Sequence, residues 1–312
     1  MSVLASPAGG RAAAMAAACT AGFLWGTGAL VVNLLIVRWG LTAESVSFWR
    51  FVVGAVALLA IFGRAPLWRH LPGHGPALLA AGACMALYVL CWFLAIARLG
   101  AAVPTLIALC LPPVLVTLWG LLRGRERIDR PLIAGLAAAL LGTVMVVARH
   151  GDAGGGVSMA AQVEGVLLSL ASALLYAGFT LVNGRLSLAL GAGPAAAGLT
   201  VVAAAVMGLT AVYVPLAWPT ELPPEAWLLY LGLVTAALAL LAFNWGARRL
   251  TPTSLTVATL VEPLTAVLLA AWLLGQAMQA AQWLGGLLML AGIAVLGHRE
   301  ARRAAPEGAD AA

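Results

Sequence analysis

Apolar residues follow one another in ten long runs along the chain, and polar residues gather in the short stretches between them. The runs cover residues 14–36, 43–62, 76–97, 101–122, 131–149, 164–184, 195–217, 226–247, 252–274 and 281–297. Each run holds roughly 17–24 residues, the length that a helix needs to cross the hydrocarbon core of a bilayer. Most runs lack the alternation of apolar and polar residues that marks the strands of a membrane barrel. The pattern therefore predicts an all-α integral membrane protein with ten transmembrane helices.

Arginines in the connecting stretches predict how the chain is oriented. The chain has 17 arginines and no lysine. If the N-terminus is cytoplasmic, thirteen arginines lie inside, three lie outside and Arg50 lies within a span. The three outer ones are Arg38, Arg98 and Arg149. Because basic residues accumulate in cytoplasmic loops, we expect a multi-pass protein of the bacterial inner membrane with both termini in the cytoplasm.

The chain also repeats itself at an offset of 150 residues. The matched pairs are Phe93 with Phe243, Arg98 with Arg248, Pro113 with Pro263, Gly135 with Gly285, and Gly142 with Gly292. We therefore predict a first repeat over 14–149, a second over 164–297 and a cytoplasmic tail over 298–312. Five spans are an odd number, so the second repeat must be inverted relative to the first. Inverted repeats are typical of secondary transporters, whose site lies between the halves near the midplane.

Composition excludes several classes of protein. Hydrophobic residues make up 63% of the chain and charged residues 9%, against about 25% charged residues in soluble domains. Such a chain is neither a soluble enzyme, nor a disordered protein, nor a nucleic-acid binder. Cys19, Cys84, Cys91 and Cys110 have no metal-binding or disulfide spacing, so we expect no metal and no cofactor.

Several short motifs resemble those of the EamA family of the drug/metabolite transporter superfamily. They are Trp25-Gly26, Arg50, Ala97-Arg98, Pro113 followed by Glu126, Glu262-Pro263 and Gly275-Gln276. The resemblance extends from about residue 14 to residue 297. Gln276 stands where the family usually has glutamate, and Arg125 where it has glycine. The resemblance implies two five-helix repeats and the transport of a small solute, but it does not name that solute.

Glu262 is the only carboxylate deep in a predicted span. A charged group at the centre of a membrane helix costs about 2.5–3.5 kcal/mol or more, so Glu262 must face a cavity, find a partner or be protonated. One interpretation is a proton-coupling or amine-binding site. The other is a protonated carboxyl that donates to a carbonyl freed by Pro263. Pro113 and Pro263, which lack an N–H group, are both predicted to break their helices.

Other polar and aromatic residues inside the spans are candidates for a substrate cavity. Rings with a polar group often line sites for small organic solutes, but each could equally serve helix packing. Arg50 could bind an anion, pair with Glu262 or extend along its helix to the outer interface. The predicted cavity set is Trp25, Asn33, Arg50, Tyr88, Trp92, Tyr176, Asn244 and Glu262.

These observations predict a secondary transporter that exports a small organic solute, such as a metabolite, an amino acid or a drug-like molecule, coupled to protons. The alternative is a membrane receptor or assembly partner that transports nothing. An intramembrane enzyme is disfavoured, because no histidine or aspartate falls inside a span. The expected partners are the solute, membrane lipid and protons, but not nucleic acid; a homodimer is left open.

Overall fold

The computed structural model describes residues 7–63, 67–99, 102–147, 158–274 and 279–304, and every regular element within them is helical. The elements are α1 (Pro7–Trp39), α2 (Ala43–Phe62), α3 (Leu67–Leu99), α4 (Ala102–Leu122), α5 (Arg130–Val147), α6 (Met159–Leu190), α7 (Ala192–Gly208), η1 (Leu209–Val212), α8 (Pro224–Tyr230), η2 (Leu231–Leu238), α9 (Ala239–Ala247), α10 (Pro252–Ala258), α11 (Val261–Leu274) and α12 (Ala280–Ala304). In the described residues, ten segments are long and apolar enough to cross a membrane. The predicted all-α fold with ten spans is confirmed.

Three of the ten spans are built from more than one helical element. The seventh combines α7 with the 3-10 turn η1, the eighth combines α8, the π-helix η2 and α9, and the ninth combines α10 and α11. The seventh span ends at Val212 rather than at the predicted residue 217. Prolines at 215, 219 and 223 explain the early end, because proline cannot supply the N–H that continues a helix.

The two prolines that were predicted to break helices behave differently. Helix α4 continues through both Pro112 and Pro113, so the predicted break at Pro113 is wrong. A membrane helix tolerates a proline where its surroundings accommodate the carbonyl that loses its N–H donor, which for Pro113 is the carbonyl of Leu109. The Thr117 hydroxyl donates to the carbonyl of Pro113 itself at 2.6 Å. The ninth span is interrupted at residues 259–260. Pro263 then occupies the first turn of α11, where an N–H would have no partner within the helix.

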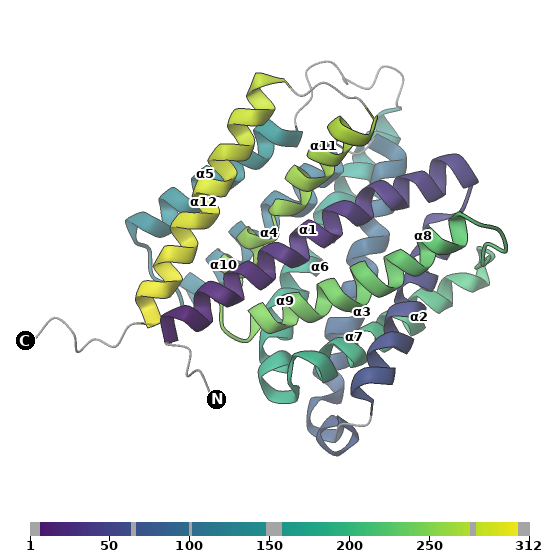
Figure 1. Ribbon diagram of the computed structural model, residues 1–312, viewed down its shortest axis with the longest axis horizontal. Coiled ribbons are helices and arrows are strands. Elements are labelled where there is room, and N and C mark those ends of the chain that lie inside the picture. Colours follow the sequence, from purple (N-terminus) through teal and green to yellow (C-terminus); the bar gives the residue numbers. More distant parts are fainter. Residues whose placement is uncertain (1–6, 64–66, 100–101, 148–157, 275–278, 305–312) are drawn as a thin grey trace, which may run out of the picture.

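Helices α5 and α12 lie side by side at one edge of the bundle (Figure 1). A Cβ atom added to Gly142 would lie 2.5 Å from the Gly285 carbonyl oxygen, and one added to Gly285 would lie 2.8 Å from the Gly142 oxygen. Gly135 and Gly292 make the same reciprocal approach, at 3.1 and 2.6 Å. Because these four glycines have no side chains, the backbones of α5 and α12 come into contact. Small residues commonly allow such close packing between membrane helices.

Spans from the first half of the chain pack mainly on spans from the second half. Helix α2 packs on α7, α3 on α6, α4 on α6, and α1 on both α9 and α11. The N-terminal end of α1 lies next to the C-terminal end of α12 (Figure 1). At this point Arg11 pairs with Glu300 at 3.3 Å. We call this end of the molecule the terminal face. The two halves therefore share one extensive interface in the centre of the bundle.

Candidate functional site

A small cavity lies at the interface between the two halves. Helices α1, α2, α3 and α4 line it from the first half, and α6, η2 and α11 line it from the second. Its volume is about 50 Å³, which is room for a few water molecules. Six residues of the predicted set line it: Trp25, Arg50, Tyr88, Trp92, Tyr176 and Glu262.

Glu262 reaches the cavity because the ninth span is interrupted just before it. The N–H of Glu262 donates to the Thr259 carbonyl at 3.0 Å, which closes the turn between α10 and α11. Glu262 then occupies the first turn of α11. The unpaired N–H groups and the positive end of the helix dipole favour a negative charge at that position. The side chain of Glu262 is half-buried and lines the cavity. It does so from the end of a helix rather than from the middle of one.

Arg50 faces the same cavity from α2, on the other half of the chain. Its guanidinium interacts electrostatically with Glu262 and with the Tyr88 hydroxyl, but it forms no ion pair with Glu262. Its Nε atom is buried and has no hydrogen-bond partner among the described residues. Arg50 therefore places a positive charge beside the cavity with one donor nitrogen unused.

A continuous series of packed aromatic rings, which we call the aromatic wall, includes Trp25, Tyr88 and Tyr176, which line the cavity, and Phe179 and Phe243 behind them. Tyr88 packs against Tyr176 with ring centroids 5.0 Å apart, and Trp25 packs against Phe243 at 5.3 Å. Phe179 joins the two pairs, 6.3 Å from Tyr176 and 5.8 Å from Phe243. Such tilted and stacked arrangements are the favoured geometries of aromatic pairs.

The polar groups of these rings are tied to the break and to the π-helix. The Tyr176 hydroxyl shares a hydrogen bond of 3.2 Å with Thr259, at the interruption of the ninth span. Trp25 Nε1 donates to the Thr235 carbonyl of η2 at 2.9 Å. Trp92 Nε1 donates to the Thr105 hydroxyl at 3.3 Å. The aromatic wall is therefore connected directly to the irregular backbone of the eighth and ninth spans.

Two carbonyl groups at the cavity lack their usual donors. Pro112 and Pro113 have no N–H, so the carbonyls of Ala108 and Leu109 receive no hydrogen bond from the residue four positions later. Ala108 and Leu109 both line the cavity. The prolines in α4 therefore leave two carbonyls next to the site without their usual backbone donor, without interrupting the helix.

Of the two asparagines in the predicted set, Asn244 does not line the cavity. Asn244 is fully buried, accepts a hydrogen bond from Asn183 at 2.8 Å and donates to the Ala192 carbonyl at 3.3 Å. Its amide thus bridges α9, α6 and α7 and does not reach the cavity. The side chain of Asn33 lies outside the described residues. Sequence reasoning also missed Ser172 and Thr235, which line the cavity, because hydroxyl residues occur in most of the spans.

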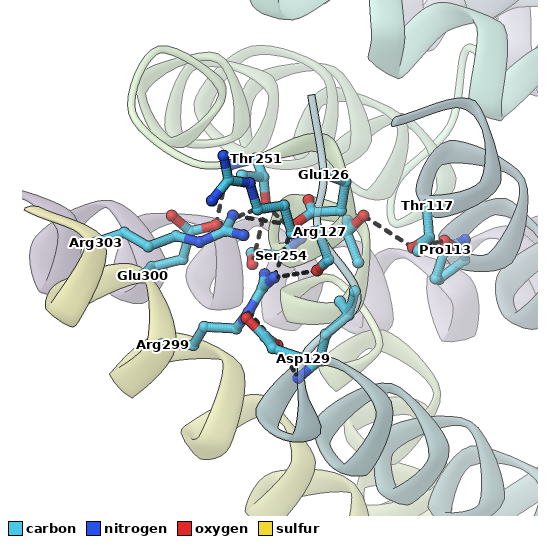
Figure 2. Close-up of polar contacts among 12 residues, drawn as sticks. Pro113, Thr117, Glu126, Arg127, Asp129, Thr251, Ser254, Arg299, Glu300 and Arg303 are labelled. Atoms are coloured by element: carbon cyan, nitrogen blue, oxygen red, sulfur yellow. Dashed lines mark hydrogen bonds and ion pairs between the residues drawn. The ribbon is translucent and has the colours of Figure 1, made fainter. Parts of the chain in front are cut away.

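A second polar cluster, the ion-pair cluster, lies at the terminal face (Figure 2). Arg299 of α12 donates from Nε to both carboxylate oxygens of Asp129 at 2.8 Å, and from Nη2 to Glu126 at 2.8 Å. Arg303 adds a second bond to Glu126 at 2.9 Å. The side chains of Arg299 and Glu126 are 3% and 4% exposed. The cluster thus holds α12 against the α4–α5 loop, with the charges of Arg299 and Glu126 largely removed from water and those of Asp129 and Arg303 partly exposed.

The neighbouring carboxylate Glu300 extends this cluster to α1 and α10. It accepts hydrogen bonds from the Thr251 hydroxyl at 2.6 Å and from Arg11 at 3.3 Å. Thr251 also caps α10 by accepting from the Ser254 N–H at 3.3 Å. Deeper in the bundle, Thr117 and Thr253 share a hydrogen bond of 2.8 Å (Figure 2). Four elements from both halves are therefore held together at the terminal face.

The contacts of the ion-pair cluster lower the pKa of Asp129. Partial burial alone would raise the pKa of Asp129, but hydrogen bonds from Arg299 and the Leu132 N–H outweigh that effect and hold the pKa below its usual value. The carboxylate is therefore charged at neutral pH. Sequence reasoning used Arg123, Arg125 and Arg127 for orientation and did not see that Glu126 pairs with α12, because the partners are 173 residues apart.

Comparisons with known proteins agree with this architecture. The model of the EamA-like transporter family matches the chain twice, over residues 12–148 and 163–297. The "Uncharacterized transporter YwfM" of Bacillus subtilis (strain 168) is 28% identical over 302 residues, which are 93% of this chain and 95% of that protein. A solved crystal structure with 23% identity superposes with a TM-score of 0.75 and covers 94% of this chain and all of that one.

The two family matches together cover most of the chain, and each contributes residues to the central cavity: Trp25, Arg50 and Tyr88 from the first, Tyr176 and Glu262 from the second. The multi-pass helical fold agrees with both matches. This chain is thus a membrane transporter that belongs to the EamA-like transporter family.

Proposed function

We propose that the protein is a secondary transporter that exports a small organic solute through the central cavity by alternating access, coupled to protons. The observation that carries this proposal is the cavity itself. Both halves of the chain line it, and it combines one carboxylate at a helix break, one arginine and a wall of aromatic rings. Broken helices at the interface of two repeats are a common design for the site of a secondary transporter.

The packing of the spans supports two inverted repeats, the first over 14–149 and the second over 164–297. If each span corresponds to the one five places later, the contact of α3 with α6 corresponds to that of α9 with α1. The contact of α4 with α6 corresponds in the same way to that of α11 with α1. The contacts of α2 with α7 and of α5 with α12 correspond to themselves. This set of pairs is what a two-fold relation between inverted halves produces.

The ion-pair cluster supports alternating access with a closed terminal face. A cavity of about 50 Å³ holds water but not an organic solute, for which sites of about 300 Å³ or more are usual. The halves must therefore separate for a solute to bind. In our proposal the terminal face is cytoplasmic, as the distribution of arginines predicts, and the bonds between Arg299, Glu126 and Asp129 must break when the site opens to the cytoplasm.

Glu262 is the proposed proton-coupling residue. It is the carboxylate that lines the cavity, and it lies where the backbone changes direction. Arg50 favours its charged form by electrostatic attraction, whereas removal from water favours its neutral form. Movement of the halves changes both influences at once, so the proton is bound on one side of the membrane and released on the other.

The test is a search for the solute followed by reconstitution. Untargeted mass spectrometry of cells that express the protein, compared with cells that express Glu262→Ala, identifies solutes that the first cells lose to the medium. Proteoliposomes loaded with those solutes then release them when a pH difference is imposed. If no solute in a complete cell extract moves across vesicles that contain the folded protein, the alternative of a receptor or assembly partner replaces transport.

A further inference from the structure

A surface groove at the terminal face, between the end of α12 and the start of α5, has the chemistry of an anionic lipid site. It has a volume of about 700 Å³ and is lined by Pro131, Ala294, Val295, His298 and Arg302, together with Asp129, Arg299 and Arg303 of the ion-pair cluster. We propose that this groove binds the headgroup of an anionic phospholipid, with the acyl chains lying along α5 and α12. The proposal does not depend on which solute is transported.

The charges around the groove leave an excess of positive charge. Three arginines line the groove, Arg299, Arg302 and Arg303, and two more, Arg127 and Arg130, are exposed on either side of Asp129 in the chain. Two carboxylates, Glu126 and Asp129, oppose these five and are already engaged by Arg299 and Arg303. The neighbouring Glu300 is paired with Arg11, so the local excess is three positive charges. Basic pockets between membrane helices are typical sites for anionic headgroups, because each arginine near the surface attracts an anionic lipid.

Two arginines keep donors available for such a headgroup. Arg302 is exposed and donates from Nε to His298 at 2.9 Å, and it has no carboxylate partner in the described part of the chain. The side chain of Arg299 also lines the groove and is 3% exposed, and its buried Nη1 atom has no hydrogen-bond partner among the described residues. Because a buried donor without an acceptor is costly, a phosphate oxygen at the base of the groove would stabilise this arrangement.

The membrane side of the groove is apolar, which favours a lipid over a free anion. Ala294 and Val295 of α12 and Pro131 of α5 form this side. The apolar surface continues away from the terminal face with exposed side chains on both helices: Ile133 and Leu141 on α5, and Leu287 and Leu290 on α12. The phosphate of a bound lipid would therefore lie beside the basic residues, and its acyl chains would cover the adjoining apolar surface. A soluble phosphate would leave that apolar surface uncovered.

The proposal is tested with the full-length protein in detergent, by native mass spectrometry and by thermal unfolding. The probes are dioleoyl phosphatidylglycerol, dioleoyl phosphatidylcholine and, as a soluble headgroup, glycerol 3-phosphate. We expect phosphatidylglycerol to stay bound to the protein in native mass spectra and to raise its Tm. Phosphatidylcholine and glycerol 3-phosphate should have little effect on either measurement. The variant Arg302→Gln should weaken phosphatidylglycerol binding about fivefold, the contribution of one arginine near an anionic lipid. Ala294→Trp, which fills the apolar side of the groove, should weaken it without changing charge.

The matched control is Arg185→Gln, which removes an equally exposed arginine from α6, outside the groove. It should bind phosphatidylglycerol like the wild type. Equal loss in Arg185→Gln and Arg302→Gln would mean that overall charge attracts the lipid, and the proposal would be wrong. Equal stabilisation by glycerol 3-phosphate would replace the lipid by a soluble anion and would overturn the proposal as well.

Discussion

Arg50 of α2 and Glu262 of α11 line the same cavity from different halves of the chain, yet they form no ion pair. The two groups interact electrostatically, and the cavity that both line has room for a few water molecules. A direct ion pair would hold the halves together, whereas without one each group stays available to a proton or a solute. The first prediction concerns the carboxylate of this pair.

Replacing Glu262 with glutamine imitates the protonated carboxyl group. We expect the variant to exchange solute across proteoliposome membranes but to lose accumulation driven by a pH difference, which for one coupled proton is about tenfold per pH unit. Uptake is measured with and without the gradient, and the Tm of the variant serves as the folding control. Full gradient-driven accumulation by Glu262→Gln would leave Glu262 with a structural role beside Pro263 and none in coupling.

Removing one polar group from each of two cavity rings tests whether the aromatic wall binds solute. Trp25→Phe removes the donor to the Thr235 carbonyl, and Tyr176→Phe removes the hydroxyl that bonds Thr259. If these two polar groups turn to the solute when it binds, each change removes one hydrogen bond to the solute, worth about 1 kcal/mol or about fivefold in affinity; loss of the bond within the protein lowers stability by a similar amount. Transport assays should therefore show a raised KM together with a small decrease in Tm. Tyr213→Phe, at an exposed position outside the cavity, is the control; a lowered Tm with unchanged KM would identify the rings as packing residues.

Both termini should be cytoplasmic. The structure places the ends of α1 and α12 on the same face, and the arginine distribution predicts that this face is inside. A reporter enzyme that is active only in the periplasm, fused after residue 303, should be inactive, while the same reporter fused in the α7–α8 connection should be active. An active reporter after residue 303 together with an inactive reporter in the α7–α8 connection would mean that both termini are periplasmic.

The ion-pair cluster should make the fold sensitive to acid. The pKa of Asp129 is lowered in the folded protein, so its stabilising effect is present above the unfolded value of about 3.9 and is lost as the pH falls through the folded value. Thermal unfolding between pH 7 and pH 3 should show a falling Tm at the acid end. Asp129→Asn should show a lower Tm at pH 7 and a smaller decrease on acidification; an identical pH profile would exclude Asp129 as the cause.

Arg299→Ala should be among the more destabilising substitutions at the terminal face. It leaves the buried Glu126 with Arg303 as its remaining partner, and breaking a buried pair typically costs about 3–5 kcal/mol. As a control, Ala in place of the exposed Arg185 should change the free energy of unfolding by about 0.5 kcal/mol or less.

If transport requires the ion-pair cluster to open, Arg299→Lys, which keeps one bond, should retain the fold and change the transport rate. Equal Tm values for the alanine variants would contradict a stabilising role of the ion-pair cluster.

The number of spans, the helical class and the family could all be predicted from the pattern of residues along the chain. The runs of 17–24 apolar residues are long enough for the bilayer and too poor in charge for water, and this constraint acts locally on each segment. The spacing of Gly135, Gly142, Gly285 and Gly292 likewise indicated close packing, because glycines seven residues apart share one face of a helix.

Which of the candidate residues lie together depends on the packing of the helices and could not be predicted from the chain. Asn244 has the chemistry of a cavity residue, but its amide is used between helices by Asn183 and the Ala192 carbonyl. Pro113 and Pro263 both lack a backbone N–H, yet α4 continues through Pro113 whereas the ninth span is interrupted before Pro263. At that interruption the N–H of Glu262 donates to the carbonyl of Thr259 and closes the turn that leads into α11. The bonds of Arg299 to Glu126 and Asp129 join residues about 170 positions apart. Such long-range pairing depends on how ten helices pack together, which no local pattern in the chain records.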